Sequence, residues 1–291
     1  MNNFEQQLLE KANILVEALP YIRKFYGKIF VIKYGGAAQK ELHLKDAFAK
    51  DIVLLNFIGI KPIVVHGGGP KISEMMKKLG KEPQFIHGHR VTDRETMEIV
   101  EMILGGVINK EIVQLINSHG GKSIGLTGKD GNLLRAIKKR LKINEEETDL
   151  GYVGEIEQVS TEILESLQKD SFIPVVAPIG FDKNGNSYNI NADTVASNIA
   201  VSMQAEKLIL LTDVKGISDD SGNHIPTLKV EDALRLISEN TISGGMIPKV
   251  YACLNALKGG VKKTHIIDGR VPHSLLLEIF TKKGIGTEII L

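Results

Sequence analysis

The sequence has one cysteine, no long apolar run and almost no excess of charge. Cys253 alone cannot form an internal disulfide, which is typical of a reducing compartment. No segment approaches the roughly 18 consecutive apolar residues of a membrane span, and charged side chains between Glu5 and Glu17 interrupt any signal-peptide core. The 36 basic and 35 acidic residues leave a formal net charge of +1. We therefore expect a cytoplasmic protein with neither nucleic acid nor a membrane as a partner.

Apolar segments of strand and helix character alternate along most of the 291 residues. Such alternation implies crossover connections and a mainly parallel sheet covered by helices on both faces, an α/β sandwich of three layers. The expected strands lie at 28–34, 61–66, 122–128, 172–180, 207–214, 264–268 and 284–291, with a hairpin at 132–158 and a turn or hairpin at 182–189. The expected helices lie at 44–58, 70–79, 94–118 with an interruption at Gly105 and Gly106, 161–169, 192–204, 230–239, 246–258 and 273–281.

A separate helix is expected before the first strand. Apolar side chains recur every three or four positions over residues 3–19, which predicts an amphipathic helix that Pro20 ends or kinks. Such a helix either packs on its own domain or reaches another subunit, and the sequence favours neither.

The apolar run IFVIKYGG, Ile29 to Gly36, places Lys33 where a buried strand is about to end in a turn. A charged side chain is costly to bury unpaired, so Lys33 should point out of the sheet toward an anion. Gly35 and Gly36 allow the backbone to approach that anion and to present N–H groups to it. The alternative is a surface lysine beside an ordinary strand-to-helix turn.

A second glycine turn, VVHGGGP, ends at Pro70, where a helix is expected to begin. Gly67, Gly68 and Gly69 have no side chains to cover their backbone N–H groups, and the N-terminus of the following helix adds positive potential. The turn therefore favours an anion. The alternative is a tight turn that needs a positive φ, which explains one glycine easily and three poorly.

Two familiar nucleotide motifs are incomplete. The stretch 119–123, HGGKS, resembles the end of a Walker A loop, but its first glycine would fall at Ile116, and no stretch completes GxGxxG. A P-loop ATPase and a nicotinamide dehydrogenase are therefore disfavoured. His87 and His89 have no third ligand nearby, so no protein metal site is expected.

Three further segments carry polar groups next to expected helix starts. Arg90, just before the cap candidate Asp93, can offer a bidentate fork to a carboxylate or can be a surface ion-pair partner. NINAD, residues 189–193, clusters polar groups before an apolar helix that Asp193 could merely cap. Lys249, about one turn inside the helix after SGGMIP, opposes the helix dipole, which is reasonable if it faces a bound phosphate.

The order of these motifs is more specific than any one of them. They are Lys33-Tyr34-Gly35-Gly36, His66-Gly67-Gly68-Gly69-Pro70, Arg90-Val91-Thr92-Asp93, Asn189-Ile190-Asn191-Ala192-Asp193, Leu211-Thr212-Asp213-Val214 and Gly244-Gly245-Met246-Ile247-Pro248-Lys249. In this order the chain closely resembles, over nearly its whole length, the N-acetylglutamate kinase family within the amino acid kinase superfamily.

The resemblance implies a central mainly parallel sheet of about eight strands and ATP-dependent phosphorylation of the γ-carboxylate of N-acetyl-L-glutamate, in arginine biosynthesis. It implies that Lys33 and Lys249 stabilise the transferring phosphoryl group and that Asp193 organises both lysines. It assigns substrate binding to Gly68, Gly69, Arg90 and Asn189. It assigns phosphate or nucleotide binding to Gly35, Gly36, Gly67, Thr212, Asp213 and Val214.

The implied phosphoryl transfer agrees with elementary chemistry. A γ-carboxylate with a pKa of about 4.3 is ionised at pH 7, so it needs no general base, and charge stabilisation matters most. Magnesium would arrive with ATP and be held mainly by its phosphates. The implied lobes are an acceptor lobe at 25–180 and an ATP lobe at 181–291, which share one sheet and follow the helix at 1–24.

Within the family, the N-terminal helix resembles that of arginine-inhibited enzymes, in which it interlaces dimers into a hexamer. The same resemblance places Tyr21, His265, Glu278 and Gly284 at an arginine site, whereas the alternative for these four is ordinary packing and capping. A signalling protein as a further partner is left open. The competing hypotheses are a sister kinase with another acceptor and a non-catalytic arginine sensor, and the presence of both lysines argues against the sensor.

Overall fold

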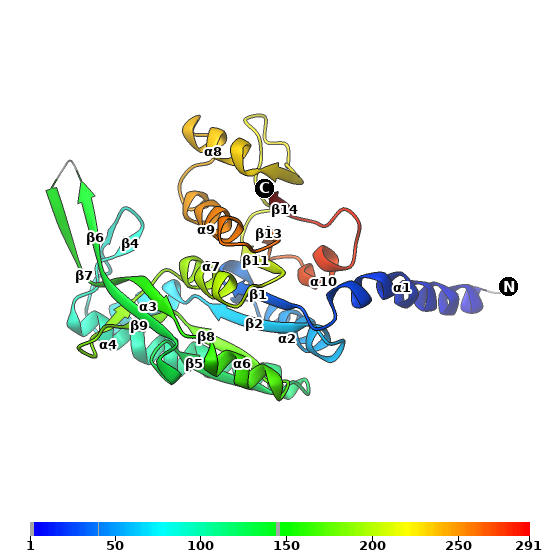
Figure 1. Cartoon of the computed structure of the whole chain (residues 1–291), viewed down its shortest axis with the longest axis horizontal. Coiled ribbons are helices and arrows are strands. Elements are labelled where there is room, and N and C mark those ends of the chain that lie inside the picture. Colours follow the sequence, from blue (N-terminus) through cyan, green and yellow to red (C-terminus); the bar gives the residue numbers. More distant parts are fainter. Residues whose placement is uncertain (1–2, 40, 144–145) are drawn as a thin grey trace.

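The structure is a computed structural model that describes residues 3–39, 41–143 and 146–291. Its main sheet contains β1 Ile29–Tyr34, β2 Lys61–His66, β5 Ser123–Thr127, β8 Ile173–Ala177, β11 Lys207–Thr212, β12 Thr227–Lys229, β13 Lys263–Asp268 and β14 Thr287–Ile290. The strand order is β12-β14-β13-β11-β1-β2-β8-β5, and every neighbouring pair is parallel except β13 and β14 (Figure 1). The mainly parallel sheet of about eight strands is confirmed. Of the eight strands of this sheet, only the short β12 has no counterpart in the sequence prediction.

Helices cover both faces of the sheet because successive strand residues point to opposite faces. On β1, Phe30 and Ile32 pack into one core and Val31 into the other. The first core also contains side chains of α2 Leu42–Phe57, α3 Gly69–Lys78, α4 Arg94–Glu101, the π-helical segment Met102–Ile108, α5 Asn109–Ser118 and α10 Ser274–Ile279. The second contains those of α6 Glu162–Lys169, α7 Ala192–Ser202, α8 Val230–Ser238 and α9 Met246–Lys258.

The remaining strands lie outside the main sheet. β6 Leu134–Ile143, β7 Glu146–Val159, β9 Ile179–Phe181 and β10 Ser187–Asn189 form a small closed barrel, and β3 Phe85–Ile86 pairs with β4 His89–Arg90. The expected hairpin at 132–158 is therefore confirmed, although its residues 144–145 lie outside the described chain. Figure 1 shows the outer part of the β6–β7 hairpin projecting from the body of the molecule, while its base belongs to the barrel.

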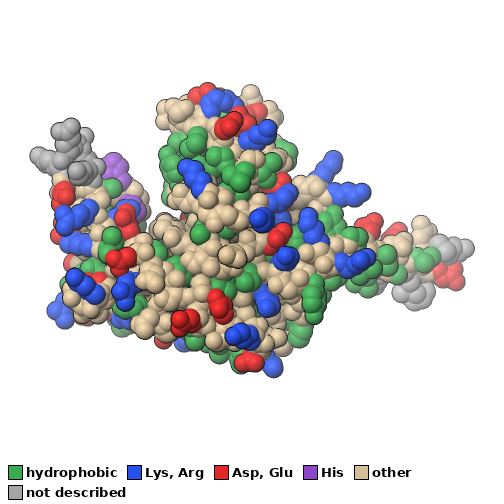
Figure 2. Space-filling model, viewed as in Figure 1, with side chains coloured by type: hydrophobic (Ala, Val, Ile, Leu, Met, Phe, Trp, Pro, Cys, Tyr) green, Lys and Arg blue, Asp and Glu red, His purple; other side chains and the backbone are tan. Residues whose placement is uncertain are grey.

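The N-terminal helix α1, Asn3–Phe25, runs through Pro20 instead of ending there. A proline inside a helix removes one backbone hydrogen bond, but here tertiary packing holds the turn that follows it. Phe25 is buried with its ring edge on Phe30, and Tyr21 has its ring edge on Phe280. The rest of α1 projects from the body and carries hydrophobic side chains along its surface (Figures 1 and 2). Within the described ranges, no helix is both long and apolar enough to cross a bilayer.

Candidate active site

Three charged side chains from three elements meet at the carboxyl end of the sheet. Lys33 comes from the end of β1, Asp193 from the first turn of α7 and Lys249 from the first turn of α9. The Asp193 carboxylate lies between the two ammonium groups: Oδ1 is 3.0 Å from Lys33 Nζ, and Oδ2 accepts a hydrogen bond of 2.8 Å from Lys249 Nζ. Residues far apart in the sequence thus form one cluster, and Lys33 is buried rather than an ordinary surface lysine.

Asp193 is available for this cluster because another residue caps its helix. Asn191 is the N-cap of α7, and its Oδ1 accepts hydrogen bonds from the backbone N–H groups of Asp193 and Thr194. The alternative that Asp193 merely caps the helix is therefore wrong. In contrast, Asp93 does cap its helix, since its Oδ1 accepts from the Thr96 N–H at 2.8 Å.

The electrostatics of the cluster leave one positive charge in excess. Burial lowers the pKa of Lys33, and Lys249 lowers it further, while Asp193 opposes both effects. Burial alone would raise the pKa of Asp193, but the two ammonium groups beside it hold that pKa below its usual value. One carboxylate between two lysines cannot neutralise both, so the cluster favours a further anion.

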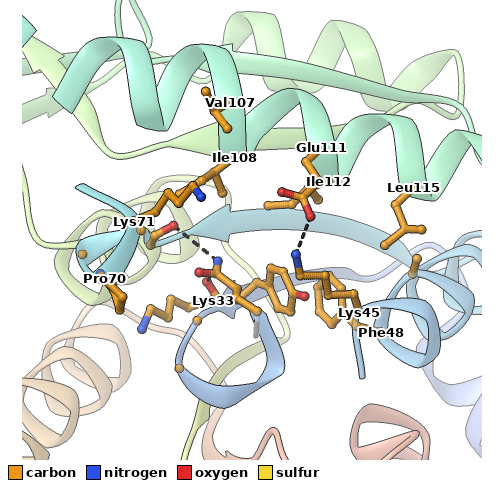
Figure 3. Close-up of a pocket in the computed structure, with 18 of the residues that line it drawn as sticks. Lys33, Lys45, Phe48, Pro70, Lys71, Val107, Ile108, Glu111, Ile112 and Leu115 are labelled. Atoms are coloured by element: carbon orange, nitrogen blue, oxygen red, sulfur yellow. Dashed lines mark hydrogen bonds and ion pairs between the residues drawn. The ribbon is translucent and has the colours of Figure 1, made fainter. Parts of the chain in front are cut away.

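The two glycine turns lie side by side at this end of the sheet because β1 and β2 are adjacent and parallel. Together with Lys33, the turns Gly35–Gly36 and Gly67–Gly69 line a cavity of about 570 Å³. Figure 3 shows this cavity between Lys33, Pro70 and Lys71 at one end and the Lys45–Glu111 ion pair at the other. The chain at Gly36 has a φ of +67°, a conformation that favours glycine.

A second cavity, of about 190 Å³, is also lined by the Gly67–Gly69 turn. Arg90 and Asn189 both line it, so the structure brings together all four residues predicted to hold the acceptor. Arg90 is buried, with Nη2 donating to the Gly69 carbonyl and to Ser73 Oγ, and its guanidinium lies over the Phe85 ring. In the described chain it has no acidic partner, so the alternative of a surface ion pair does not hold.

The predicted nucleotide segment Thr212–Val214 follows β11, the other neighbour of β1. The turn at Gly36 packs against it, since a Cβ added at Gly36 would lie 3.5 Å from the Thr212 carbonyl carbon and 3.6 Å from the Asp213 nitrogen. Thr212 is buried, whereas Asp213 and Val214 are exposed. This segment therefore lies beside the first glycine turn.

Sequence reasoning missed three polar side chains that support these turns. Gln39 Nε2 donates to the carbonyls of Tyr34 and Gly67, and buried His66 contacts both the Gly67 carbonyl and the side chain of Asn109. The position of His66 next to three glycines was the available signal. Nothing in the sequence pointed to Asn109.

The four residues predicted for an arginine site line a separate cavity of about 410 Å³ at the root of α1. His265 Nδ1 lies 2.7 Å from Glu278 Oε1, and His265 Nε2 lies 2.7 Å from Lys207 Nζ. Gly284, with a φ of +62°, leaves room for Glu278, because a Cβ there would lie 2.6 Å from Oε2. Tyr21 reaches this cavity only because α1 continues past Pro20.

Burial sets the charges in this second cavity. It lowers the pKa of His265, and it lowers the pKa of Lys207 to about 8. Burial alone would raise the pKa of Glu278, but His265 and the backbone N–H groups of Ile285 and Gly286 bring it down to about 2. The cavity therefore holds an ionised carboxylate that already has three partners.

The family model described as "Amino acid kinase family" matches residues 28–268, which include both glycine turns and all three residues of the charged cluster. The chain belongs to the amino acid kinase family. It is an enzyme of that family, and its similarity to curated acetylglutamate kinases extends over almost the full length. It is 56% identical to the acetylglutamate kinase of Persephonella marina, covering 98% of this chain and 99% of that one. It is 55% identical to the one of Sulfurihydrogenibium sp., covering 98% and 100%.

Solved structures of lower sequence identity also resemble this chain. The N-acetylglutamate synthase from Neisseria gonorrhoeae, complexed with coenzyme A and N-acetyl-glutamate, superimposes with a TM-score of 0.86 at 29% identity. The same synthase complexed with coenzyme A and L-arginine gives 0.82 at 28%. This chain is covered to 96% in both cases but spans only 63% and 65% of the synthase chain. Giardia carbamate kinase, at 18% identity and a TM-score of 0.66, shares the fold.

Proposed function

We propose that this enzyme transfers the γ-phosphoryl group of ATP to the γ-carboxylate of N-acetyl-L-glutamate, giving N-acetyl-L-glutamyl 5-phosphate in arginine biosynthesis. The observation that carries the proposal is the Asp193 carboxylate held between Lys33 and Lys249, at 3.0 Å and 2.8 Å, beside two glycine turns. The full-length identity to acetylglutamate kinases supports this acceptor.

The proposed transfer is direct and in line. The ionised acceptor carboxylate attacks the γ-phosphorus while the bond to the β,γ-bridging oxygen breaks, so no proton has to be removed from the acceptor. Lys33 and Lys249 lower the barrier by neutralising charge on the phosphoryl oxygens as attacking and leaving groups separate. Asp193 keeps both ammonium groups aligned while leaving a net positive charge for the phosphoryl group.

Substrate positions follow from the two cavities. Arg90 and Asn189 hold the α-carboxylate of the acceptor against the amides of Gly68 and Gly69, and Thr212, Asp213 and Val214 lie beside the nucleotide. The division into residues 1–24, an acceptor lobe at 25–180 and an ATP lobe at 181–291 remains part of the proposal. So does a cytoplasmic location.

The residues present fit a magnesium ion that arrives with ATP. Mg²⁺ prefers oxygen ligands and commonly uses one or two carboxylates together with substrate phosphates and water. The central carboxylate, Asp193, is engaged by two lysines, and the described residues contain no group of three His, Cys, Asp or Glu side chains suited to a metal. Phosphate oxygens and water would supply most of the ligands of such an ion, which would offset part of the phosphate charge.

A hydroxylamine assay tests the activity. The protein mixed with ATP, magnesium, N-acetyl-L-glutamate and hydroxylamine should yield a hydroxamate from the acyl phosphate. No product with this acceptor, but turnover with aspartate, glutamate, carbamate or UMP, would reassign the chain to a sister kinase. No phosphoryl transfer to any acceptor would favour the non-catalytic arginine sensor.

We also propose that L-arginine inhibits the enzyme by binding in the cavity of Tyr21, His265, Glu278 and Gly284, and that α1 interlaces three dimers into a hexamer. The ionised Glu278 carboxylate can contact a cationic ligand, in a cavity that six lysines also line. The large apolar side chains exposed on α1 suit a helix that packs on another subunit: they are Leu9, Ile14, Leu15, Val16 and Leu19.

Removal of residues 1–20 tests the assembly. The truncated chain should sediment as a dimer and lose sensitivity to arginine while the charged cluster stays complete. A hexamer that survives the truncation would reject the role of α1, whatever the outcome of the hydroxylamine assay.

A further inference from the structure

The two glycine turns are joined to each other through two carbonyl oxygens, those of Tyr34 and Gly67. The Gly67 carbonyl accepts hydrogen bonds from Gln39 Nε2 at 3.3 Å and from His66 Nδ1 at 3.0 Å. The same Gln39 Nε2 donates to the Tyr34 carbonyl at 3.1 Å, which also accepts from the Gly67 N–H at 3.0 Å. Since Tyr34 precedes the first glycine turn and Gly67 begins the second, Gln39 links one turn directly to the other.

The protonation of His66 follows from its partners. A carbonyl oxygen can only accept, so Nδ1 carries the proton that binds Gly67. Burial lowers the pKa of His66 to about 4, so the ring is neutral at pH 7 and Nε2 must accept a hydrogen bond. Asn109 Nδ2, at 3.2 Å, is the donor.

The side-chain amide of Asn109 is in turn held in one orientation by its other partners. Its Nδ2 also faces the carbonyls of Val175, at 2.9 Å, and Leu126, at 3.4 Å, and both can only accept. The amide nitrogen therefore points at His66 and the strands β5 and β8 rather than away from them. A buried Asn held in this way fixes the tautomer and the ring plane of its histidine partner.

The π-helical segment Met102–Ile108 brings a second support to the same turn. A Cβ at Gly68 would clash with the methyl groups of Ile108 and Leu104, so these side chains pack directly on the turn. A π-turn contains about one residue more than a turn of α-helix. The residues that follow it are therefore rotated by about 100° around the helix axis. Asn109, the first residue after this segment, owes its direction toward His66 to that extra residue.

We propose that Gln39, His66 and Asn109 are positioning residues that hold the two glycine turns in one fixed arrangement around the transferring phosphoryl group. None of the three touches the reacting atoms in this scheme. They act by setting where the Gly35–Gly36 and Gly67–Gly69 amides point before substrate binds. The inference rests on the proposed phosphoryl transfer, because it assigns the turns to the two sides of the same reaction.

The test replaces Gln39 with methionine, which keeps the length of the side chain and removes its N–H donors. The matched control is Gln168→Met: Gln168 Nε2 donates to the carbonyl of Lys61, the first residue of β2, at the end of the strand away from the glycine turn. Both variants lose a glutamine donor to a backbone carbonyl, so a general loss of stability should be similar in the two.

We expect Gln39→Met to lower kcat about tenfold, with smaller changes in both KM values, because misplaced catalytic groups affect the transition state most. Gln168→Met should keep kcat close to that of the wild type at a comparable Tm. Asn109→Leu should lower kcat more than Gln39→Met, since it frees the His66 ring. Equal kcat values for Gln39→Met and Gln168→Met would overturn the inference, even if Asn109→Leu does not fold.

A second readout separates this inference from the proposed acceptor. If the wild type forms no hydroxamate from N-acetylglutamate, the proposed function fails, and the increase in Tm caused by ATP with magnesium is compared instead. Gln39→Met should then show a smaller nucleotide-induced increase in Tm than Gln168→Met. Equal increases would overturn the positioning role independently of the acceptor.

Discussion

The candidate active site and the cavity at the root of α1 each contain a buried carboxylate, but the two carboxylates have different partners. Asp193 lies between two lysine ammonium groups, whereas Glu278 pairs with one imidazole and accepts from the backbone N–H groups of Ile285 and Gly286. The first arrangement leaves a positive charge without a partner. The second satisfies the carboxylate with neutral donors, so its negative charge persists.

The difference lies in the partners of each carboxylate rather than in the sheet, since the two clusters lie at strands β1 and β13 of the same sheet. Excess ammonium charge around Asp193 favours a phosphate. Glu278 offers a carboxylate to a cation such as a guanidinium, and six lysines line its cavity as well.

The largest effect is expected from removing either ammonium group of the first cluster. Lys33→Ala and Lys249→Ala should each lower kcat by about 10²–10³, because each lysine is proposed to act mainly on charge that develops in the transition state. Hydroxamate formation at saturating substrates measures this. The matched control is Lys45→Ala, since Lys45 lines the same cavity but pairs with Glu111. A rise in KM with kcat retained would contradict the assignment.

A smaller effect is expected from Arg90→Ala, which removes the guanidinium fork proposed to hold the acceptor. The KM for N-acetylglutamate should rise about tenfold to a hundredfold, in line with about 1.5–3 kcal/mol for hydrogen bonds to charged groups. Steady-state kinetics with varied acceptor measures it, with the exposed Arg94→Ala as a control. A change confined to the KM for ATP would place Arg90 elsewhere.

The second cavity is tested by Glu278→Gln, which keeps the shape of the side chain and removes its charge. The arginine concentration for half-inhibition should rise about tenfold or more, because a charge-assisted contact is lost. Glu239→Gln, at the exposed C-cap of α8, serves as the control. Inhibition that stays as strong as in the wild type would refute this location for arginine.

The smallest effect is on stability in acid. In the folded chain the pKa of Glu278 is about 2, below the usual 4.5 of a glutamate, so its contribution to stability is nearly complete above about pH 5.5 and is lost as the pH falls toward 2. Between pH 6 and pH 3 the wild type should lose about 2 kcal/mol of unfolding free energy that Glu278→Gln does not lose. Urea unfolding at both pH values measures the difference, and parallel pH profiles for the two proteins would contradict it.

The alternation of strands and helices was readable in the sequence because period and turn residues decide it locally. Lys33 was readable for a similar reason, since a lysine at the end of an apolar strand needs a partner. Its partner, Asp193, and the second lysine lie more than 150 residues further along the chain, and no local rule joins them. Only the order of motifs shared with a known family linked the three in advance.

The misses have a common physical origin in tertiary contacts. Pro20 is a helix breaker by local rules, but the packing of Tyr21 and Phe25 outweighs the lost hydrogen bond. The Gly105–Gly106 interruption was readable, but not its consequence, a π-turn that aims Asn109 at His66. A polar side chain in a helix pattern does not reveal which buried carbonyl groups it will meet.

Because α1 is one continuous helix, a tilt at its attached end displaces its far end. Its 23 residues measure about 35 Å at 1.5 Å per residue, so a tilt of about 10° at one end moves the other by about 6 Å. The helix is attached to the body at its last turn, where Tyr21 and Phe25 form part of the wall of a cavity. A ligand in that cavity that tilted the last turn would therefore move the far end of the helix much more than the turn itself.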